Sequence, residues 1–291
     1  MNNQEIIKTY EEGASLASLS RKTGLSVYKI KKILQNNSIS IRTRFEQAVF
    51  TNMQRGKKVN HNYFDVLTYE NAYYLGFIAA DGCVRPNRNE IKIGLSSIDK
   101  EWLEEFKMKL NSEREIEDYI TNKGFSISEL KFSSLKIKIE LAKYSIVPNK
   151  TYLGITMEAI PDKYKLAFIK GYFDGDGCFV FNKNTKQCSL KITSCTKKIL
   201  EEISDYFKAG SIYLHGNNFE LNFSTLPALS IMQSFYSLDT PCLKRKKEKY
   251  LEALKIRIEI NPRAKDASKE DESLCWTYIN MKYKNYKIKS L

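Results

Sequence analysis

One segment of this chain occurs twice, and this repetition constrains the fold more than any other feature. Residues 74–83 read YLGFIAADGC, and residues 169–178 read IKGYFDGDGC. Each copy leads into a stretch of alternating apolar and polar residues and then into an amphipathic helix. We therefore expect an α+β protein built from two similar halves, each with helices and pairs of strands.

The pattern of apolar residues locates the expected elements in each half. Alternation predicts strands at 91–95 and 135–141 in the first copy, and at 190–192, 211–214 and 219–223 in the second. Helical spacing predicts amphipathic helices around residues 102–110 and 199–207. Alternation buries one face of a sheet and leaves the other polar. Lysines at the polar strand positions are therefore expected to face outward: Lys92, Lys136, Lys138 and Lys191.

Small residues recur at a spacing of four within each motif, which places them on one face of a helix. In the first copy these residues are Gly76 and Ala80, and in the second they are Gly171 and Gly175. Small residues at this spacing let two helix backbones approach closely. We therefore predict that the two motif helices pack against each other, which brings their ends together.

Each motif ends in an aspartate followed by a glycine: Asp81 with Gly82, and Asp176 with Gly177. The C-terminal end of a helix carries partial negative charge, so a carboxylate there is unfavourable, and two adjoining carboxylates repel each other. Divalent metal ions between them would relieve this repulsion, and carboxylate-bound Mg²⁺ beside phosphate is a common device for phosphodiester hydrolysis. One Asp-Gly pair alone could equally be a turn signal, but two matched copies favour a metal site.

At these residues the sequence resembles the LAGLIDADG homing endonucleases, over roughly residues 67–260. The resemblance implies two αββαββα halves about a pseudo-dyad, whose sheets form a saddle on DNA. The outward lysines Lys92, Lys136, Lys138 and Lys191 are then expected to bind DNA. It also implies that Asp81 and Asp176, with the glycines that follow them, form the metal site. Asp174 corresponds to Ala79 of the first copy and is not expected to be an equivalent ligand.

The family also has a basic residue near the metals, late in each half. Lys150 and Lys246 lie at nearly equal distances after the two aspartates and are the candidates. A lysine there would orient the attacking water or stabilise the charge of the transition state. For the second cluster, contact with DNA phosphates is the alternative, and Lys244 and Arg245 are assigned to DNA binding.

The first 36 residues predict a small DNA-binding head. Helices are expected at 5–12, after Ser15 and after Ser26, and a Gly-containing turn joins the last two in a helix-turn-helix. In such heads the last helix enters the major groove. Its polar face offers Tyr28, Lys29, Lys31 and Lys32. A three-helix packing module with a solvated lysine face is the alternative.

The remaining segments complete the expected organisation. Residues 37–66 form a basic connector with weak apolar periodicity, in which Arg42 and Arg44 are candidate DNA contacts, although a solvated linker is the alternative. The predicted units are then the head (1–36), the linker (37–66), two halves (67–158 and 159–260) and a C-terminal extension (261–291).

Composition narrows the class of partner. The 291 residues include 47 Lys and Arg against 34 Asp and Glu, a net charge of +13 that favours a polyanion such as nucleic acid. The six cysteines form no Cys-x-x-Cys pair and only two histidines are present, so a structural zinc site is not expected. The sequence has no pattern typical of a secretory signal or a membrane span, so we expect a cytoplasmic protein of a bacterium or a phage-infected cell.

These patterns and the resemblance together indicate a monomeric, site-specific endonuclease. It would cut both strands of a long asymmetric DNA target, leave 3′ overhangs and use Mg²⁺, with Mn²⁺ as a substitute. An intron maturase that binds RNA is one alternative, but a helix-turn-helix suits the major groove of B-form DNA better. A transcription regulator with an inactive nuclease body is another. The presence of both aspartates and both lysines argues against it.

Overall fold

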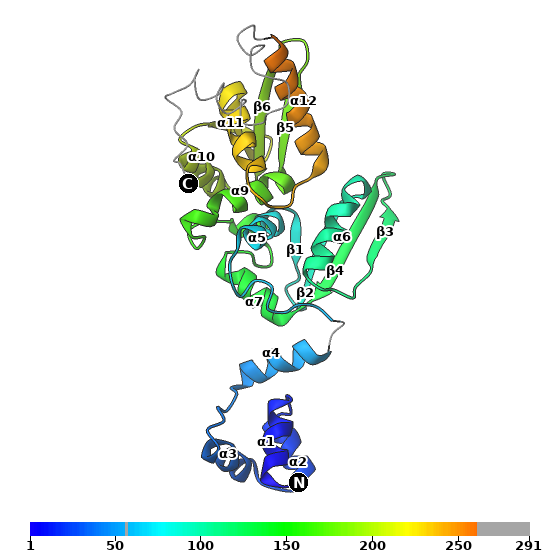
Figure 1. The fold of residues 1–291 in the computed structure, drawn as a ribbon, viewed down its shortest axis with the longest axis vertical. Helices are drawn as coiled ribbons and strands as arrows, with labels where there is room; N and C mark the ends of the chain where they lie inside the picture. The colour runs from blue at the N-terminus through cyan, green and yellow to red at the C-terminus, as the bar shows by residue number, and fades with distance from the viewer. Residues whose placement is uncertain (56–57, 261–291) are drawn as a thin grey trace.

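The computed structural model describes residues 1–55 and 58–260, and it shows a small helical head joined to a larger α+β body (Figure 1). The predicted C-terminal extension, 261–291, lies outside the described residues. Within the described part of the chain, no helix has the length and apolar character needed to cross a membrane.

Three helices make up the head: α1 (Asn3–Glu11), α2 (Leu16–Thr23) and α3 (Val27–Asn36). The side chains of Ser15 and Ser26 cap α2 and α3, and Gly24 adopts the left-handed conformation (φ 74°) in the turn between them. The head has its own hydrophobic core, formed by Ile6, Tyr10, Leu19, Ile30 and Leu34. The predicted order of helices and turn is therefore present.

The body contains the same series of elements twice. The first half comprises α5 (Tyr69–Asp81), β1 (Gly82–Val84), β2 (Glu90–Ser96), the 3-10 turn η1 (Ser97–Asp99), α6 (Lys100–Lys109), β3 (Ile116–Ile120), β4 (Ser126–Ser133), α7 (Leu135–Lys143) and the short α8 (Lys150–Leu153). The second comprises α9 (Asp162–Asp176), β5 (Gly177–Asn182), β6 (Gln187–Ser194), α10 (Lys197–Phe207), β7 (Ser211–His215), β8 (Asn218–Ser224), α11 (Thr225–Tyr236) and α12 (Lys244–Ile260). This confirms the predicted fold class of two αββαββα halves.

Each half has one antiparallel four-stranded sheet, with strand orders β1-β2-β4-β3 and β5-β6-β8-β7. The central pairs have equivalent registers, with Ile93 opposite Leu130 in one sheet and Ile192 opposite Leu221 in the other. All four of these side chains are buried. The alternation seen in the sequence therefore turns one face of each sheet toward its helices.

The motif helices α5 and α9 pack against each other at the centre of the body (Figure 1). A Cβ atom added to Gly76 would lie 1.9 Å from the carbonyl oxygen of Phe168, and one added to Gly171 would lie 1.9 Å from that of Tyr73. A Cβ on Gly175 would lie 2.4 Å from that of Ala80. The predicted close approach is confirmed, and it excludes larger side chains at these glycines.

The predicted strand at 135–141 is wrong, because these residues form helix α7. Its buried side chains, Ile137 and Leu141, are four residues apart, which is helical spacing, and Ser134 caps the helix by accepting a hydrogen bond from the Ile137 amide. The strands of this half lie earlier, at β3 and β4. Over so short a stretch, alternating Leu and Ile are compatible with both the period of a strand and that of a helix. The Ser134 cap favours the helix.

The connector is also more ordered than its weak periodicity predicted. Residues Arg44–Arg55 form helix α4, which lies between the head and the body (Figure 1).

Candidate functional site

The two motif aspartates lie where α5 and α9 end beside each other. A Cβ on Gly175 of α9 would be 3.5 Å from the Cγ atom of Asp81 at the end of α5. Asp176 ends α9 in the equivalent position. Both aspartates are exposed residues, so a ligand can reach them from solvent.

Nearby cations, Lys150 and Lys246 among them, only partly offset the negative charge of the two carboxylates. Surrounding protein atoms partly desolvate them, and this raises the pKa of Asp81 above its usual range. Desolvation, together with the negative charge of Asp81, raises the pKa of Asp176 to about 6. Two carboxylates held in this way favour a positively charged ligand.

The predicted lysines lie at the same two helix ends, where each caps backbone carbonyls. The Nζ atom of Lys150 donates to the carbonyl oxygens of Ala79 and Ala80, each at 2.7 Å. The Nζ atom of Lys246 donates to those of Phe173 (2.6 Å), Asp174 (2.8 Å) and Gly177 (2.6 Å). The last carbonyls of a helix have no partner within it, and a cation there complements the helix dipole. The lysines therefore also hold the ends of the motif helices in place.

The two lysines differ in the donors they have left. An ammonium group has three N–H bonds. Lys246 uses all three on carbonyls, whereas Lys150 leaves one without an acceptor among the described residues. Both side chains are buried, and desolvation lowers the pKa of Lys150 and lowers that of Lys246 to about 8.

The glycines after the aspartates are required by the tight turn from helix into strand. Gly82 (φ −73°) and Gly177 (φ −108°) are not left-handed helix caps but the first residues of β1 and β5. An added Cβ would lie 2.6 Å from the carbonyl oxygen of Ile78 or Phe173, respectively. The chain turns from helix into strand too tightly for a side chain.

Asp174 points away from the paired carboxylates, which agrees with its expected exclusion from the metal ligands. It is buried between the halves, where its Oδ2 accepts hydrogen bonds from the hydroxyl of Tyr73 (2.7 Å) and the amide of Leu243 (3.1 Å). The Tyr73 hydroxyl in turn accepts from Trp102 Nε1 at 2.8 Å. Only the fold reveals this network, because its members are far apart in sequence.

Both copies of the repeated motif match a known protein family. A family model described as a LAGLIDADG-like domain matches residues 68–140 and 163–209, which include both motif aspartates. The similarity to this domain therefore extends over both copies of the repeated motif. The uncharacterized protein MJ0314 of Methanocaldococcus jannaschii is 28% identical to this chain over 228 residues, which are 75% of this chain and 82% of the relative.

Solved structures of LAGLIDADG proteins are similar at lower identity. The I-LtrWI LAGLIDADG homing endonuclease bound to target DNA has 15% identity and a TM-score of 0.47, covering 77% of this chain and 98% of its own. The LAGLIDADG meganuclease I-AabMI bound to uncleaved DNA has 14% identity and a TM-score of 0.47, covering 76% and 99%.

The donor set at the two helix ends is suited to a hydrated hard cation. Within the described residues, no group of three or more His, Cys, Asp or Glu side chains could hold a metal. Asp81 and Asp176 supply two carboxylates, and the carbonyl of Gly177 already accepts from Lys246. Mg²⁺ keeps several waters and often binds through only one or two carboxylates plus substrate phosphates. The residues present therefore fit Mg²⁺.

A small pocket adjoins the second aspartate. It is lined by Ala79, Ala80, Lys150, Thr151, Ile155, Tyr172, Asp176, Thr193, Ser194, Cys195, Thr196 and Asn218. Both the lysine of the first half and the aspartate of the second thus line one cavity. The end of β6, including Ser194, and Asn218 at the start of β8 contribute its polar wall.

The two sheet lysines occupy equivalent places on the polar faces. Lys92 forms an ion pair with Glu129, and Lys191 forms one with Glu220 (2.8 Å). Glu129 also binds Lys131 at 2.7 Å, a residue that the sequence analysis had not selected. These lysines do face outward as expected, but each already has a carboxylate partner.

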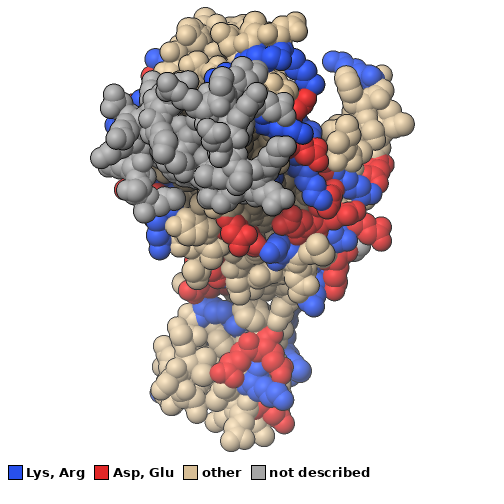
Figure 2. All heavy atoms as spheres, turned by 45° about the horizontal axis from the view of Figure 1, so that its top comes forward, with Lys and Arg blue, Asp and Glu red and all other residues tan. Residues whose placement is uncertain are grey.

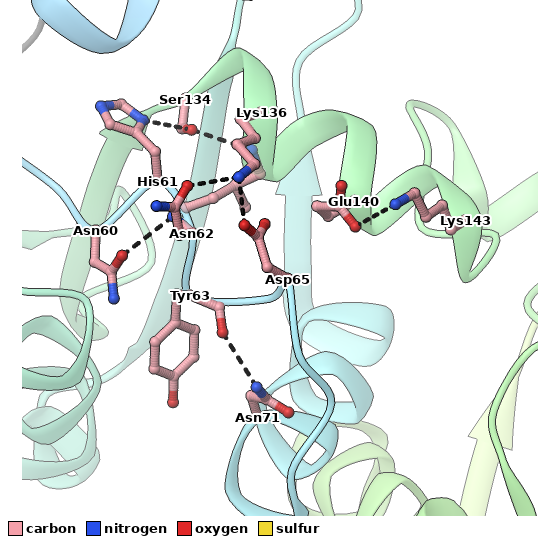
Figure 3. Close-up of polar contacts among 11 residues, drawn as sticks. Asn60, His61, Asn62, Tyr63, Asp65, Asn71, Ser134, Lys136, Glu140 and Lys143 are labelled. Carbon is pink, nitrogen blue, oxygen red and sulfur yellow. Dashed lines mark hydrogen bonds and ion pairs between the residues drawn. The ribbon is translucent and has the colours of Figure 1, made fainter.

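Lys136 and Lys138 are not on a sheet, contrary to the sequence prediction, because their segment is helix α7. Lys136 binds the carboxylate of Asp65 and the side-chain oxygen of Asn62 (2.5 Å; Figure 3). Lys138 donates to the backbone carbonyls of Arg85, Pro86 and Arg88. Lys136 holds the end of the connector, and Lys138 the loop between β1 and β2, against α7, so their assignment to a DNA-binding sheet is withdrawn.

Three further candidate cations are engaged within the protein. Lys244 pairs with Glu101 (2.5 Å) and Arg245 with Asp99 (2.8 Å), which joins α12 to the first half. Arg42 donates to backbone carbonyls of the head. On the face drawn in Figure 2, blue basic side chains are interspersed with red acidic ones.

The candidate cations of α3 and of the start of α4 are exposed by comparison. Lys29, Lys31 and Lys32 are exposed on α3, Tyr28 is 71% exposed, and Arg44 is exposed at the start of α4. Among the described residues these side chains have no carboxylate partner.

Proposed function

We propose that this protein is a site-specific endonuclease of the LAGLIDADG type that hydrolyses both strands of a DNA duplex with the help of Mg²⁺. The observation that carries the proposal is the pairing of Asp81 and Asp176. They are exposed at adjoining helix ends, and each carboxylate has its pKa raised by its surroundings. A stable protein gains nothing from this repulsion, whereas a metal site uses it.

The aspartates and lysines at the helix ends have different roles in the proposed reaction. Asp81 and Asp176 would hold the divalent cation, which when bound supplies charge neutralisation at the phosphate and favours ionisation of a nucleophilic water. Lys150 and Lys246 hold the helix ends, and with them the carboxylates, in position. Lys150 also retains one N–H that can donate to a phosphate oxygen as its negative charge increases.

The two halves differ in sequence, which implies an asymmetric target and action as a monomer. The outer faces of the sheets would lie along the duplex, and α3 of the head would enter a major groove with its exposed lysines. We infer 3′ overhangs, Mn²⁺ as a substitute metal and a cytoplasmic location from the family resemblance and the sequence. Maturase activity on RNA is the second candidate, but the head favours B-form DNA.

Cleavage in vitro tests the proposal directly. The protein incubated with Mg²⁺ and a DNA library is expected to yield discrete fragments, because a saddle that recognises a long site cuts rarely. Chelation with EDTA should abolish the fragments, and added Mn²⁺ should restore them. A library that stays intact at high protein concentration, while bound, would instead support the inactive regulator.

The head lysines provide a second test. Replacing Lys29, Lys31 and Lys32 with Ala is expected to weaken DNA binding and to reduce the log–log salt slope by about 0.9 for every phosphate that is no longer neutralised. Cleavage at saturating protein should persist, because the paired aspartates are untouched. Binding is measured by titration at several salt concentrations, with the exposed Lys22 of α2 changed to Ala as the control. An unchanged affinity and slope would make the head a packing or partner-binding module.

A further inference from the structure

Helix α4 is attached to the head at the C-terminal end of α1. Three side chains of the connector donate hydrogen bonds there: Arg42 to the carbonyls of Tyr10 (2.6 Å) and Ala14 (3.0 Å), Gln47 to that of Gly13 (2.9 Å), and Gln54 to that of Glu12 (2.5 Å). Carbonyls at the end of a helix need such external donors. The connector therefore completes the hydrogen bonding of the head.

An aromatic contact reinforces this attachment. The guanidinium of Arg42 lies 4.0 Å from the ring centre of Tyr10 and 4.7 Å from that of Phe50. Phe50 lies directly against Gly13, where an added Cβ would be 2.1 Å from the ring. Gly13 also has a left-handed backbone (φ 111°), so glycine is required there for two reasons.

The other side of α4 is attached to the body at the N-terminal end of α7. The Oδ1 atom of Asn52 accepts a hydrogen bond from the amide of Leu135 at 2.8 Å. The buried His61 bridges the two helices, with Nε2 3.2 Å from the carbonyl of Met53 and Nδ1 2.7 Å from the hydroxyl of Ser134, the cap of α7 (Figure 3). A carbonyl can only accept, so Nε2 carries the proton in this contact.

The two attachments are chemically complementary. α4 offers donors to the C-terminal carbonyls of one helix and an acceptor to the N-terminal amides of another. A flexible linker would not need hydrogen bonds to both the head and the body. These contacts therefore act as two fixed joints on one rigid helix.

We propose that α4 holds the head at a set position relative to the paired aspartates, so that the DNA segment contacted by the head lies at a set spacing from the cleaved bonds. The proposal rests on the proposed function for its DNA part. Arg42, Gln47, Gln54, Asn52 and His61 are then positioning residues for specificity. B-form DNA turns once in about 10–10.5 base pairs, so a rigid head would miss its contact when the spacing changes by half a turn.

The rigidity is tested on the free full-length protein by ¹⁵N relaxation. In the unaltered protein the head and body amides are expected to report the same rotational correlation time. A variant with Arg42→Ala, Gln47→Ala and Gln54→Ala should give a shorter correlation time for the head than for the body. Gln4→Ala is the matched control, because Gln4 is an exposed glutamine on α1 without a side-chain hydrogen bond among the described residues.

A second variant distinguishes release of the folded head from unfolding of the head. Asn52→Ala with His61→Ala releases α4 from the body and leaves the separate core of the head untouched. It should also free the head, with the dispersed amide spectrum of the head retained. Independent tumbling in the unaltered protein, or common tumbling in both variants, overturns the proposal whatever the protein does to DNA.

The spacing is tested on DNA duplexes carrying a cleaved site selected from a random library. Five base pairs are inserted between the segment that the head protects and the cleavage position. The unaltered protein is expected to bind about tenfold or more weakly, the contribution of a second tethered contact, and the three-residue variant should be affected less. Equal tolerance of the insertion by both proteins overturns the proposal. Common tumbling combined with no head-dependent protection would instead show that the proposed DNA role of the head, and the spacing with it, is wrong.

Discussion

Asp81→Asn and Asp176→Asn are each expected to reduce double-strand cleavage by about 10³-fold or more, the scale of losing a catalytic group. Each change removes one of the two carboxylates that would hold Mg²⁺ and leaves the packing of α5 and α9 unaltered. Binding should persist or tighten slightly, because a negative charge near DNA phosphates disappears. Single-turnover cleavage and equilibrium binding, measured side by side, separate these effects.

The same variants make a prediction about stability. Asp81 and Asp176 repel each other at the negative ends of two helices, so removing one charge should raise the melting temperature or leave it unchanged. Asp205→Asn, which changes an exposed aspartate of α10, is the control and should cut normally. Full cleavage by either motif variant would contradict the site, and so would a loss of binding as large as the loss of cleavage.

Lys246→Met is expected to destabilise the protein strongly. The change removes hydrogen bonds to three carbonyls at the end of α9, and it leaves the buried Asp174 without its largest compensating charge. Removing one member of a buried charged pair costs roughly 3–5 kcal/mol. Urea unfolding should show this loss as a lower midpoint.

Lys150→Met should behave differently, because Lys150 caps only two carbonyls and keeps one N–H free. We expect a smaller loss of stability, and cleavage about 10²-fold slower at saturating DNA. Lys249→Met, which changes an exposed lysine of α12, is the matched control for both. The proposed catalytic role of Lys150 would be wrong if both variants lost stability equally and the folded fraction of Lys150→Met cleaved DNA at the normal rate.

Much of the site was predictable because its signals are local and repeated. Gly76 and Gly171 each identify a helix face by spacing alone, and two such faces in one chain imply that they meet. Asp81 and Asp176 then follow as neighbours, because each ends its helix. The family resemblance, together with nearly equal distances after the aspartates, predicted both lysines, although it did not show that they cap the helix ends.

Local patterns gave wrong predictions where two of them competed or where a partner lay far away in the chain. Residues 135–141 alternate like a strand, but Ser134 caps them as a helix and β4 already fills the place in the sheet. Lys136 and Lys138 were selected as free surface cations. Their partners, such as Asp65, lie on loops that only the folded body brings within reach.

The sequence by itself determined the duplicated architecture, the contact between the motif helices and the position of the two aspartates, because periodicity and small residues act over a few turns of helix. The tertiary structure alone decided which cations remain available for a ligand. Lys92, Lys191, Lys244 and Arg245 are paired with carboxylates from other elements. It also decided that the connector is a helix attached at both sides, since those hydrogen bonds join segments whose distance in space no local pattern encodes.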